Sequence, residues 1–191
     1  MNFSAAIDLF DAENARDPNL ETVDGVLEPR ELLYARRLTG WLLKLAPDAS
    51  EPLRLAARCQ HICRWTIPRA SYPMTKPGYL CWRNDLKNFH AQKAGEILRA
   101  AGADEALIKK VQDLNLKKNF PADPESRLLE DALCLVFLEF QLGDLARKTS
   151  EDKLVNAIQK TWKKMSPSAH SHALALPFES KEKQLIQRAL G

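Results

Sequence analysis

The segment between residues 52 and 87 combines basic and aromatic side chains in a way that suits an anionic ligand. It holds seven basic residues and one acidic residue, Asp85. Basic groups attract phosphate or carboxylate, and aromatic faces stack on planar groups. We therefore predict a site for a small phosphorylated ligand, with the binding residues Arg58, Gln60, Arg64, Arg69, Tyr72, Tyr79, Trp82 and Arg83.

Two histidines and a carboxylate pair add groups that bind metals or move protons. His61 and His90 lie within and just after the basic segment, and Glu130-Asp131 precede a strongly apolar run. Burying unpaired carboxylates is costly, so this pair must cap a helix, pair with an arginine or bind a metal. We predict Glu130 and Asp131 as catalytic candidates. We predict His61, His90 and Asp131 as candidate ligands of a divalent metal such as Mn, Fe, Zn or Mg.

The same residues also have structural alternatives. His61 would hydrogen-bond a neighbouring carboxylate, and His90 would cap a packing face. The arginines and tryptophans would make internal ion pairs and core contacts, and the function would then lie in protein interaction. Residues 1–31 carry eight acidic side chains, which would neutralise the basic segment in that case.

Other spacings that resemble known motifs give weaker signals. Cys59 and Cys63 are one helical turn apart, but His61 would point roughly 200° away from them, so we predict buried thiols rather than a metal site. His170 and His172 have the spacing of some metal ligands, but their polar surroundings predict exposure to solvent. The chain contains no CxxC, Walker, GxGxxG or GxSxG motif.

Apolar spacing and turn residues predict that helices position nearly all of these groups. We expect helices over residues 4–14, 28–45, 51–62, 80–101, 104–118, 128–142 and 151–165, with two short helices around Pro177. Ser50 and Ser150 are predicted N-caps, Asp104 is predicted to start its helix, and Gly102 is predicted to end the helix before it. Three prolines between residues 66 and 78 predict a stiff loop that presents Arg69 and Tyr72. No strand is predicted, so the fold class is an all-α, multi-helix bundle.

Length and composition are those of an ordinary globular protein. The chain has 191 residues, of which 45% are hydrophobic and 28% charged, with a net charge of +3. We predict one helical domain over 1–191, with an acidic N-terminal extension over 1–27 packing on it and a C-terminal helical tail over 166–191. No apolar run reaches the ~18 residues of a membrane span, and the N-terminus lacks signal-peptide features, so we expect a cytoplasmic protein.

Several strings of uncommon residue combinations are spread over nearly the whole chain. They are Leu55–Trp65, Pro68-Arg69, Tyr72–Met74, Gly78–Leu80, Trp82-Arg83, Phe89-His90, Leu129–Asp131, Leu135–Glu139 and Lys160–Ser166. Together they resemble the domain-of-unknown-function family 4202. The resemblance implies a bacterial domain with fungal relatives, and it implies no activity.

The helix order also resembles that of HD-domain phosphohydrolases. That superfamily places a His on one helix, a His-Asp doublet on the next and an Asp on a later helix, all of which bind metal. Here Gln60-His61 is similar to the approach to the doublet, and Glu130-Asp131 to the later Asp. Ile62 replaces the Asp of the doublet, and residues 31–45 contain no His. The resemblance therefore implies an HD-domain-like bundle with a rearranged metal site that uses His61, His90, Glu130 and Asp131.

Two functional hypotheses follow from these residues. The first is binding of a small phosphorylated, nucleotide-like ligand, with metal-dependent phosphohydrolysis left open. The second is a non-catalytic nucleotide-binding, RNA-binding or protein-interaction module on a degenerate HD-like fold. The modest net charge favours a small ligand over RNA, since extended phosphate binding needs a broad basic face. The ligand, the reaction and the oligomeric state stay open.

Overall fold

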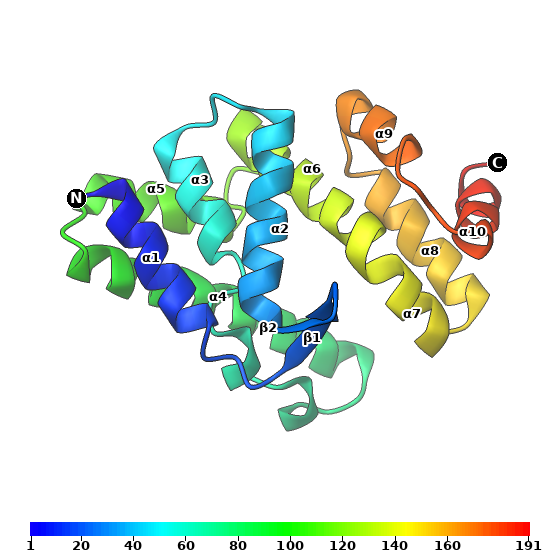
Figure 1. Cartoon of the computed structure of the whole chain (residues 1–191), viewed down its shortest axis with the longest axis horizontal. Coiled ribbons are helices and arrows are strands. Elements are labelled where there is room, and N and C mark those ends of the chain that lie inside the picture. The colour runs from blue at the N-terminus through cyan, green and yellow to red at the C-terminus, as the bar shows by residue number, and fades with distance from the viewer.

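Ten α-helices make up most of the chain in the computed structural model, which describes residues 1–191 (Figure 1). They are α1 (Phe3–Asn14), α2 (Arg30–Leu45), α3 (Glu51–Cys59), α4 (Lys76–Ala100), α5 (Glu105–Asn115), α6 (Pro124–Val136), α7 (Leu142–Lys148), α8 (Glu151–Trp162), α9 (Pro167–Leu174) and α10 (Ser180–Leu190). Short 3-10 turns lie at Arg64–Thr66 and Arg69–Ser71, and a π-helical segment spans Phe137–Gln141. The predicted all-α class is confirmed.

A small hairpin is the one departure from helical structure. Strands β1 (Leu20–Val23) and β2 (Val26–Pro29) pair antiparallel and precede α2 directly. Asp24 and Gly25 both have positive φ in the turn, which a two-residue hairpin of this kind requires. The prediction of no strand is therefore wrong, and the helix expected from residue 28 begins at Arg30. The strands were missed because they are short and mostly exposed, so that their apolar alternation is weak.

The predicted helix starts at Ser50, Asp104 and Ser150 are confirmed, although Ser150 makes no side-chain capping hydrogen bond. The Ser50 hydroxyl accepts a hydrogen bond from the Leu53 backbone N–H at 3.3 Å, and the Asp104 carboxylate accepts one from the Leu107 N–H at 2.8 Å. Each supplies an acceptor to the N–H groups that a helix start leaves without partners. Gly102, between α4 and α5, has a φ of +78°, a conformation that favours glycine.

Helix α3 ends at Cys59, three residues earlier than predicted. Cys63 adopts a left-handed conformation with a φ of +52°, which turns the chain away from the helix axis. His61 therefore lies in the turn after α3 rather than on a helix.

Helix α4 begins at Lys76, inside the region predicted to be a loop. The Thr75 hydroxyl caps it by accepting from the Gly78 N–H at 3.2 Å, and Pro77 fits the first turn because its missing N–H is not needed there. Tyr79, Trp82 and Arg83 consequently lie on the first two turns of a helix.

One apolar cluster of 35 buried residues extends from Ala6 in α1 to Ala189 in α10. Helix α6 packs against α2, α3, α5 and α9, and its Leu129, Leu135 and Val136 are buried. The prediction of a core helix in this region is confirmed, although the helix continues beyond Val136 as a π-helical segment rather than an α-helix. None of the helices is both long and apolar enough to span a membrane.

Helix α1 is joined to α3 by an ion pair. Arg58 donates from Nε to Asp11 Oδ1 at 2.6 Å and from Nη2 to Asp11 Oδ2 at 2.5 Å. The two side chains are only 12% and 24% exposed, so that solvent screens the pair weakly. Part of the acidic N-terminal segment therefore neutralises part of the basic segment within the fold.

We expect Arg58→Ala to destabilise the protein by about 2 kcal/mol, because it leaves the Asp11 carboxylate partly buried without its partner. The value is below the ~3–5 kcal/mol of a fully buried pair because both side chains keep some exposure. Urea denaturation measures it. Arg36→Ala, which removes a more exposed pair with Glu28, is the control and should cost less than about 1 kcal/mol. Equal stability of the two variants would contradict the assignment.

Candidate functional site

A group of polar residues, buried except for the half-buried His61, lies where the start of α2, the turn after α3 and the middle of α4 meet. Glu31 is on α2, His61 is in the turn and His90 is on α4. His61 Nδ1 is 3.5 Å from Glu31 Oε2, and the ring centroids of His61 and His90 are 5.6 Å apart. Tyr34 stacks on His61 with ring centroids 4.1 Å apart. We call Glu31, Tyr34, His61 and His90 the polar cluster.

Three buried polar atoms in and beside the polar cluster have no hydrogen-bond partner within the protein. They are Glu31 Oε2, His90 Nε2 and, in the residue next to His61, Gln60 Oε1. Buried polar atoms are nearly always paired, and leaving one without a partner costs about 1–3 kcal/mol. The cluster therefore keeps hydrogen-bonding capacity that a bound water or ligand would satisfy.

Burial also sets the protonation of the polar cluster. It raises the pKa of the Glu31 carboxyl to about 7, against the opposing charge of Arg64. It lowers the pKa of His61 well below its ordinary range, and the charges of Arg64 and Arg83 lower it further. The pKa of His90 falls to about 2, mainly through burial. At neutral pH both imidazoles are therefore neutral, and Glu31 exchanges its proton near physiological pH.

Two arginines border the polar cluster. Arg64 Nε is 3.8 Å from Glu31 Oε1, and its guanidinium carbon lies 4.8 Å from the centroid of the Trp82 ring. Arg83 is exposed and has no carboxylate partner, yet its charge lowers the pKa of both histidines in the cluster. These two predicted ligand residues thus come together beside the cluster, and Arg83 is free to bind an anion.

Two other predicted arginines make contacts within the protein. Both carboxylate oxygens of Asp11 accept from Arg58. Arg69 donates to the backbone carbonyls of Tyr72 at 3.0 Å and Pro73 at 2.7 Å, and its guanidinium carbon lies 6.0 Å from the Tyr79 ring centroid. These contacts give both arginines a structural role, and their predicted contact with a ligand stays a prediction.

The predicted aromatic residues differ in how accessible they are. Trp82 is 8% exposed, and its Nε1 donates to the Ile67 carbonyl at 2.9 Å. The Tyr72 hydroxyl donates to Asp85 Oδ2 at 2.9 Å. Tyr79 is 44% exposed, with its ring centroid 5.8 Å from that of Trp82. Tyr79 is therefore the most exposed of the three rings.

The predicted catalytic carboxylates are buried, but both have protein partners. Glu130 contacts the Lys117 ammonium and lies 3.2 Å from Lys164 Nζ. Burial alone would raise the pKa of Glu130, but the two lysines outweigh it and lower that pKa. Asp131 Oδ1 accepts from the Ser166 backbone N–H at 2.8 Å and ties α6 to the start of α9. These contacts account for the burial of both carboxylates without any catalytic role.

The residues present do not fit the metal centre that the HD-domain resemblance implies. No three His, Cys, Asp or Glu side chains converge in an arrangement that would hold a metal ion. His61 and His90 are neighbours, but Asp131 is bonded to Ser166, and α2 contributes Glu31 to the region in place of a His. The side chains of His61, His90 and Asp131, predicted as a set of metal ligands, are therefore not brought together.

The buried cysteine thiols and the histidines of the C-terminal helices pack within the fold. Cys59, Cys63 and Cys134 are buried, and burial raises the pKa of each thiol to about 12, so that they stay protonated and unreactive. His170 and His172 are predicted to face solvent, but both are half-buried. The His170 ring stacks on Trp162 with centroids 4.0 Å apart, and the His172 ring meets Trp41 edge-on with centroids 5.9 Å apart. The prediction of exposure is wrong for both, because the fold gives each ring an aromatic partner.

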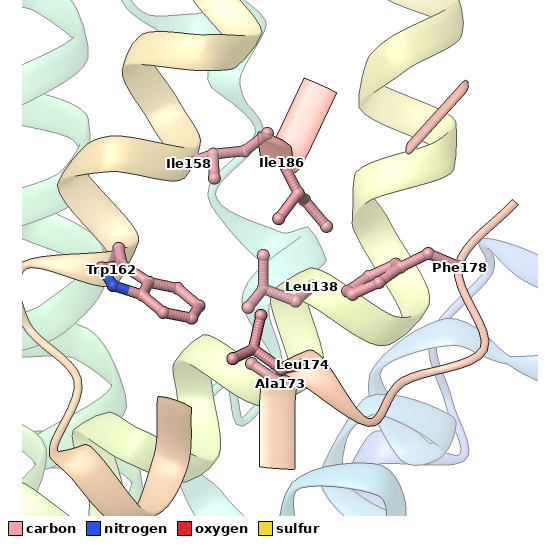
Figure 2. Close-up of a pocket in the computed structure, with 7 residues that line it drawn as sticks. All are labelled: Leu138, Ile158, Trp162, Ala173, Leu174, Phe178 and Ile186. Carbon is pink, nitrogen blue, oxygen red and sulfur yellow. The ribbon is translucent and has the colours of Figure 1, made fainter. Parts of the chain in front are cut away.

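A pocket among the C-terminal helices is wholly apolar. Figure 2 shows the rings of Trp162 and Phe178 directed into it from opposite sides. The lining residues are Leu138, Ile158, Trp162, Ala173, Leu174, Phe178 and Ile186. Because ligand sites rely on a few placed polar groups for orientation, this pocket is a poorer candidate for chemistry than the polar cluster.

Glu31 and Tyr34 were not among the residues predicted from the sequence. A signal for them exists, because Glu31, Tyr34, Leu38 and Leu42 follow one another at helical spacing along one face of α2. All four are buried. A carboxylate on the apolar face of a predicted helix therefore indicates a buried charge that needs an explanation.

Together these features define an all-helical protein with a buried polar site bordered by two arginines. The chain belongs to the family described as domain of unknown function DUF4202, whose model matches residues 4–186. The resemblance to this family is confirmed over nearly the whole chain. No curated protein and no solved structure matches the chain. The HD-domain-like arrangement thus stays a prediction.

Proposed function

We propose that this chain binds a small phosphorylated, nucleotide-like ligand at the polar cluster and its two bordering arginines. The observation that carries the proposal is the position of Arg83, which is exposed and unpaired beside buried polar atoms that lack partners. Arginine suits phosphate because its planar fork of N–H groups binds two oxygens at once. The exposed ring of Tyr79 offers a face on which a base would stack.

The geometry favours a small ligand over an extended nucleic acid. Arg58 and Arg69 are bonded within the protein, and Trp82 is buried. The basic surface near the cluster is thereby reduced, whereas RNA binding needs a broad basic face with accessible aromatic rings. A single phosphate group needs only Arg64 and Arg83. A cytoplasmic location is part of this proposal.

Hydrolysis of a phosphate ester is the reaction that the polar cluster suits best, and we include it in the proposal. Glu31, with a pKa of about 7, would take a proton from a water molecule that the neutral His61 orients. The water oxygen would bond to phosphorus, the ester P–O bond would break, and Glu31 would pass the proton to the leaving alkoxide, which becomes the alcohol. Arg64 and Arg83 would offset the charge on the phosphoryl oxygens.

We expect Arg64→Ala and Arg83→Ala each to weaken ligand binding about tenfold or more. A charge-assisted hydrogen bond contributes about 1.5–3 kcal/mol, and 1.4 kcal/mol is a tenfold change in Kd. A thermal-shift screen of nucleotides and sugar phosphates would select the ligand, and calorimetry would give its Kd.

The matched control for this experiment is Lys181→Ala combined with Lys183→Ala. It removes two exposed positive charges on α10, which lies at the right-hand end of the molecule, away from α2, α3 and α4 (Figure 1). This control should bind the selected ligand as the wild type does. If both arginine variants also bind it with unchanged Kd, the ligand does not lie at the polar cluster.

A further inference from the structure

A second polar cleft lies between the β1–β2 hairpin, α2 and the junction of the π-helical segment with α7. It has a volume of about 170 Å³. Its polar walls include Glu21, Arg30, Arg37, Gln141, Asp144 and Lys148. Of the polar cluster, only Tyr34 also lines this cleft. Figure 1 shows the hairpin beside the N-terminal end of α2, and the cleft lies between this region and α7.

The two carboxylates of the cleft are already neutralised by protein partners. Glu21 Oε1 accepts from Arg37 Nη1 at 2.7 Å, and the Arg37 guanidinium is fixed further by the Phe140 ring, whose centroid is 4.2 Å away. Asp144 pairs with Arg147, which is not part of the lining. Neither acid is therefore left to offset another positive charge in the cleft.

Two cations of the cleft have no carboxylate partner. Arg30 begins α2 and Lys148 ends α7, so that they approach the cleft from different elements, and both are exposed. Arg30 lies where the helix dipole already places partial positive charge, and a cation at this position costs folding free energy. The residues that line the cleft carry a formal net charge of +1, and Arg30 stands at a position where the helix dipole disfavours a cation.

The π-helical segment Phe137–Gln141 provides a neutral hydrogen-bonding group beside these cations. π-helical turns are rare and occur frequently at functional sites. Gln141 lies at the end of the segment and lines the cleft, where its side chain is exposed and makes no capping hydrogen bond to α7. An amide N–H donor that lines the same cleft as an arginine and a lysine completes a set of groups that suits an oxyanion.

We propose that this cleft is a second binding site, for a phosphate-class anion held by Arg30, Lys148 and Gln141. The volume is below the ~300–1,000 Å³ of pockets that enclose drug-sized ligands, so the cleft suits inorganic phosphate or the phosphate group of a small monoester. The proposal does not depend on the function proposed for the polar cluster, because the two sites use different cations.

Calorimetric titration of the full chain with inorganic phosphate and with glycerol 3-phosphate, at constant ionic strength in chloride buffer, tests this site. Arg30→Ala with Lys148→Ala should weaken binding of phosphate at the cleft at least about tenfold. Arg64→Ala with Arg83→Ala should leave that binding in place, and Lys181→Ala with Lys183→Ala should titrate as the wild type. Equal affinity for the two anions would assign recognition to phosphate alone, and tighter binding of the ester would assign it to a monoester.

The cleft assignment is overturned if the Arg30/Lys148 double variant titrates as the wild type with both anions. It is also overturned if the Arg64/Arg83 double variant alone abolishes all binding, a result that would support the polar cluster instead. Arg30→Gln with Lys148→Gln repeats the test with side chains that keep more of their length. Thermal melting should show that the alanine and the glutamine double variants of Arg30 and Lys148 are both folded, since these two residues are exposed.

Discussion

The Glu31→Gln variant should be more stable than the wild type at pH 8 and should match it near pH 4. Burial raises the pKa of Glu31 from an ordinary 4.5 to about 7, so the folded state holds this proton more tightly than the unfolded state does. The stability that the protonated carboxyl contributes is fully present below about pH 4.5 and is lost as the pH rises through about 7. Glutamine imitates the protonated form at every pH, and the gap at pH 8 should reach about 3 kcal/mol.

Urea denaturation of both proteins between pH 4 and pH 8 measures this gap. Glu96→Gln, which changes an exposed carboxylate on α4, is the control and should follow the wild-type pH dependence. Curves for Glu31→Gln and wild type that stay parallel across this range would show that Glu31 does not titrate in the buried cluster. The proposed proton acceptor for phosphohydrolysis would then be lost.

The His90→Gln variant should resist acid better than the wild type. Burial lowers the pKa of His90 from 6.5 to about 2, so the folded state keeps the ring neutral where the unfolded state protonates it. The stability contributed by the neutral ring is present above pH 6.5 and is lost progressively as the pH falls towards about 2. Below pH 6.5 the wild type should lose about 1.4 kcal/mol per pH unit through this group, and the variant should not.

Denaturation midpoints between pH 4 and pH 7 check this expectation. His61 is also buried with a lowered pKa, so some acid sensitivity should persist in the variant. His172→Gln, among the C-terminal helices, controls for the loss of any imidazole. If His90→Gln and His172→Gln lose stability in parallel with the wild type as the pH falls, His90 is not kept neutral by burial.

The helices could be predicted from the sequence because their signals are local. Apolar spacing along α2 and α6 and the caps Ser50 and Asp104 act within a few residues of the elements they define. The hairpin could not be predicted in the same way, since only its Asp24-Gly25 turn carries a strong local signal.

The candidate site was only partly predictable, because tertiary contacts decide which charged groups stay free. Arg64 and Arg83 appear in the basic pattern of the sequence, and so does Arg58. Arg58 differs from the other two because its guanidinium binds Asp11, which lies 47 residues earlier in the chain. Asp131 likewise finds its partner in the backbone of Ser166, 35 residues later. No spacing rule within a helix gives such contacts.

The polar cluster joins three elements that are distant along the chain. Glu31, His61 and His90 meet only because α2, the turn after α3 and α4 pack together. The residue in the left-handed conformation at the end of this turn is Cys63, whereas glycine or asparagine usually adopts that conformation. The sequence therefore gives no local signal for the turn. The sequence therefore indicates the chemistry of the separate residues, and the fold decides that Glu31 joins the histidines in place of Asp131.

The most direct test of the proposed function is a nuclear magnetic resonance titration that follows the ring signals of the four histidines. The probe is the tightest-binding phosphorylated compound from the thermal-shift screen. Binding at the polar cluster should move the signals of His61 and His90, leave those of His170 and His172 in place, and be weakened about tenfold or more by Arg83→Ala. Movement confined to His170 and His172, or no movement of His61 and His90 at saturating ligand, would contradict the proposed site.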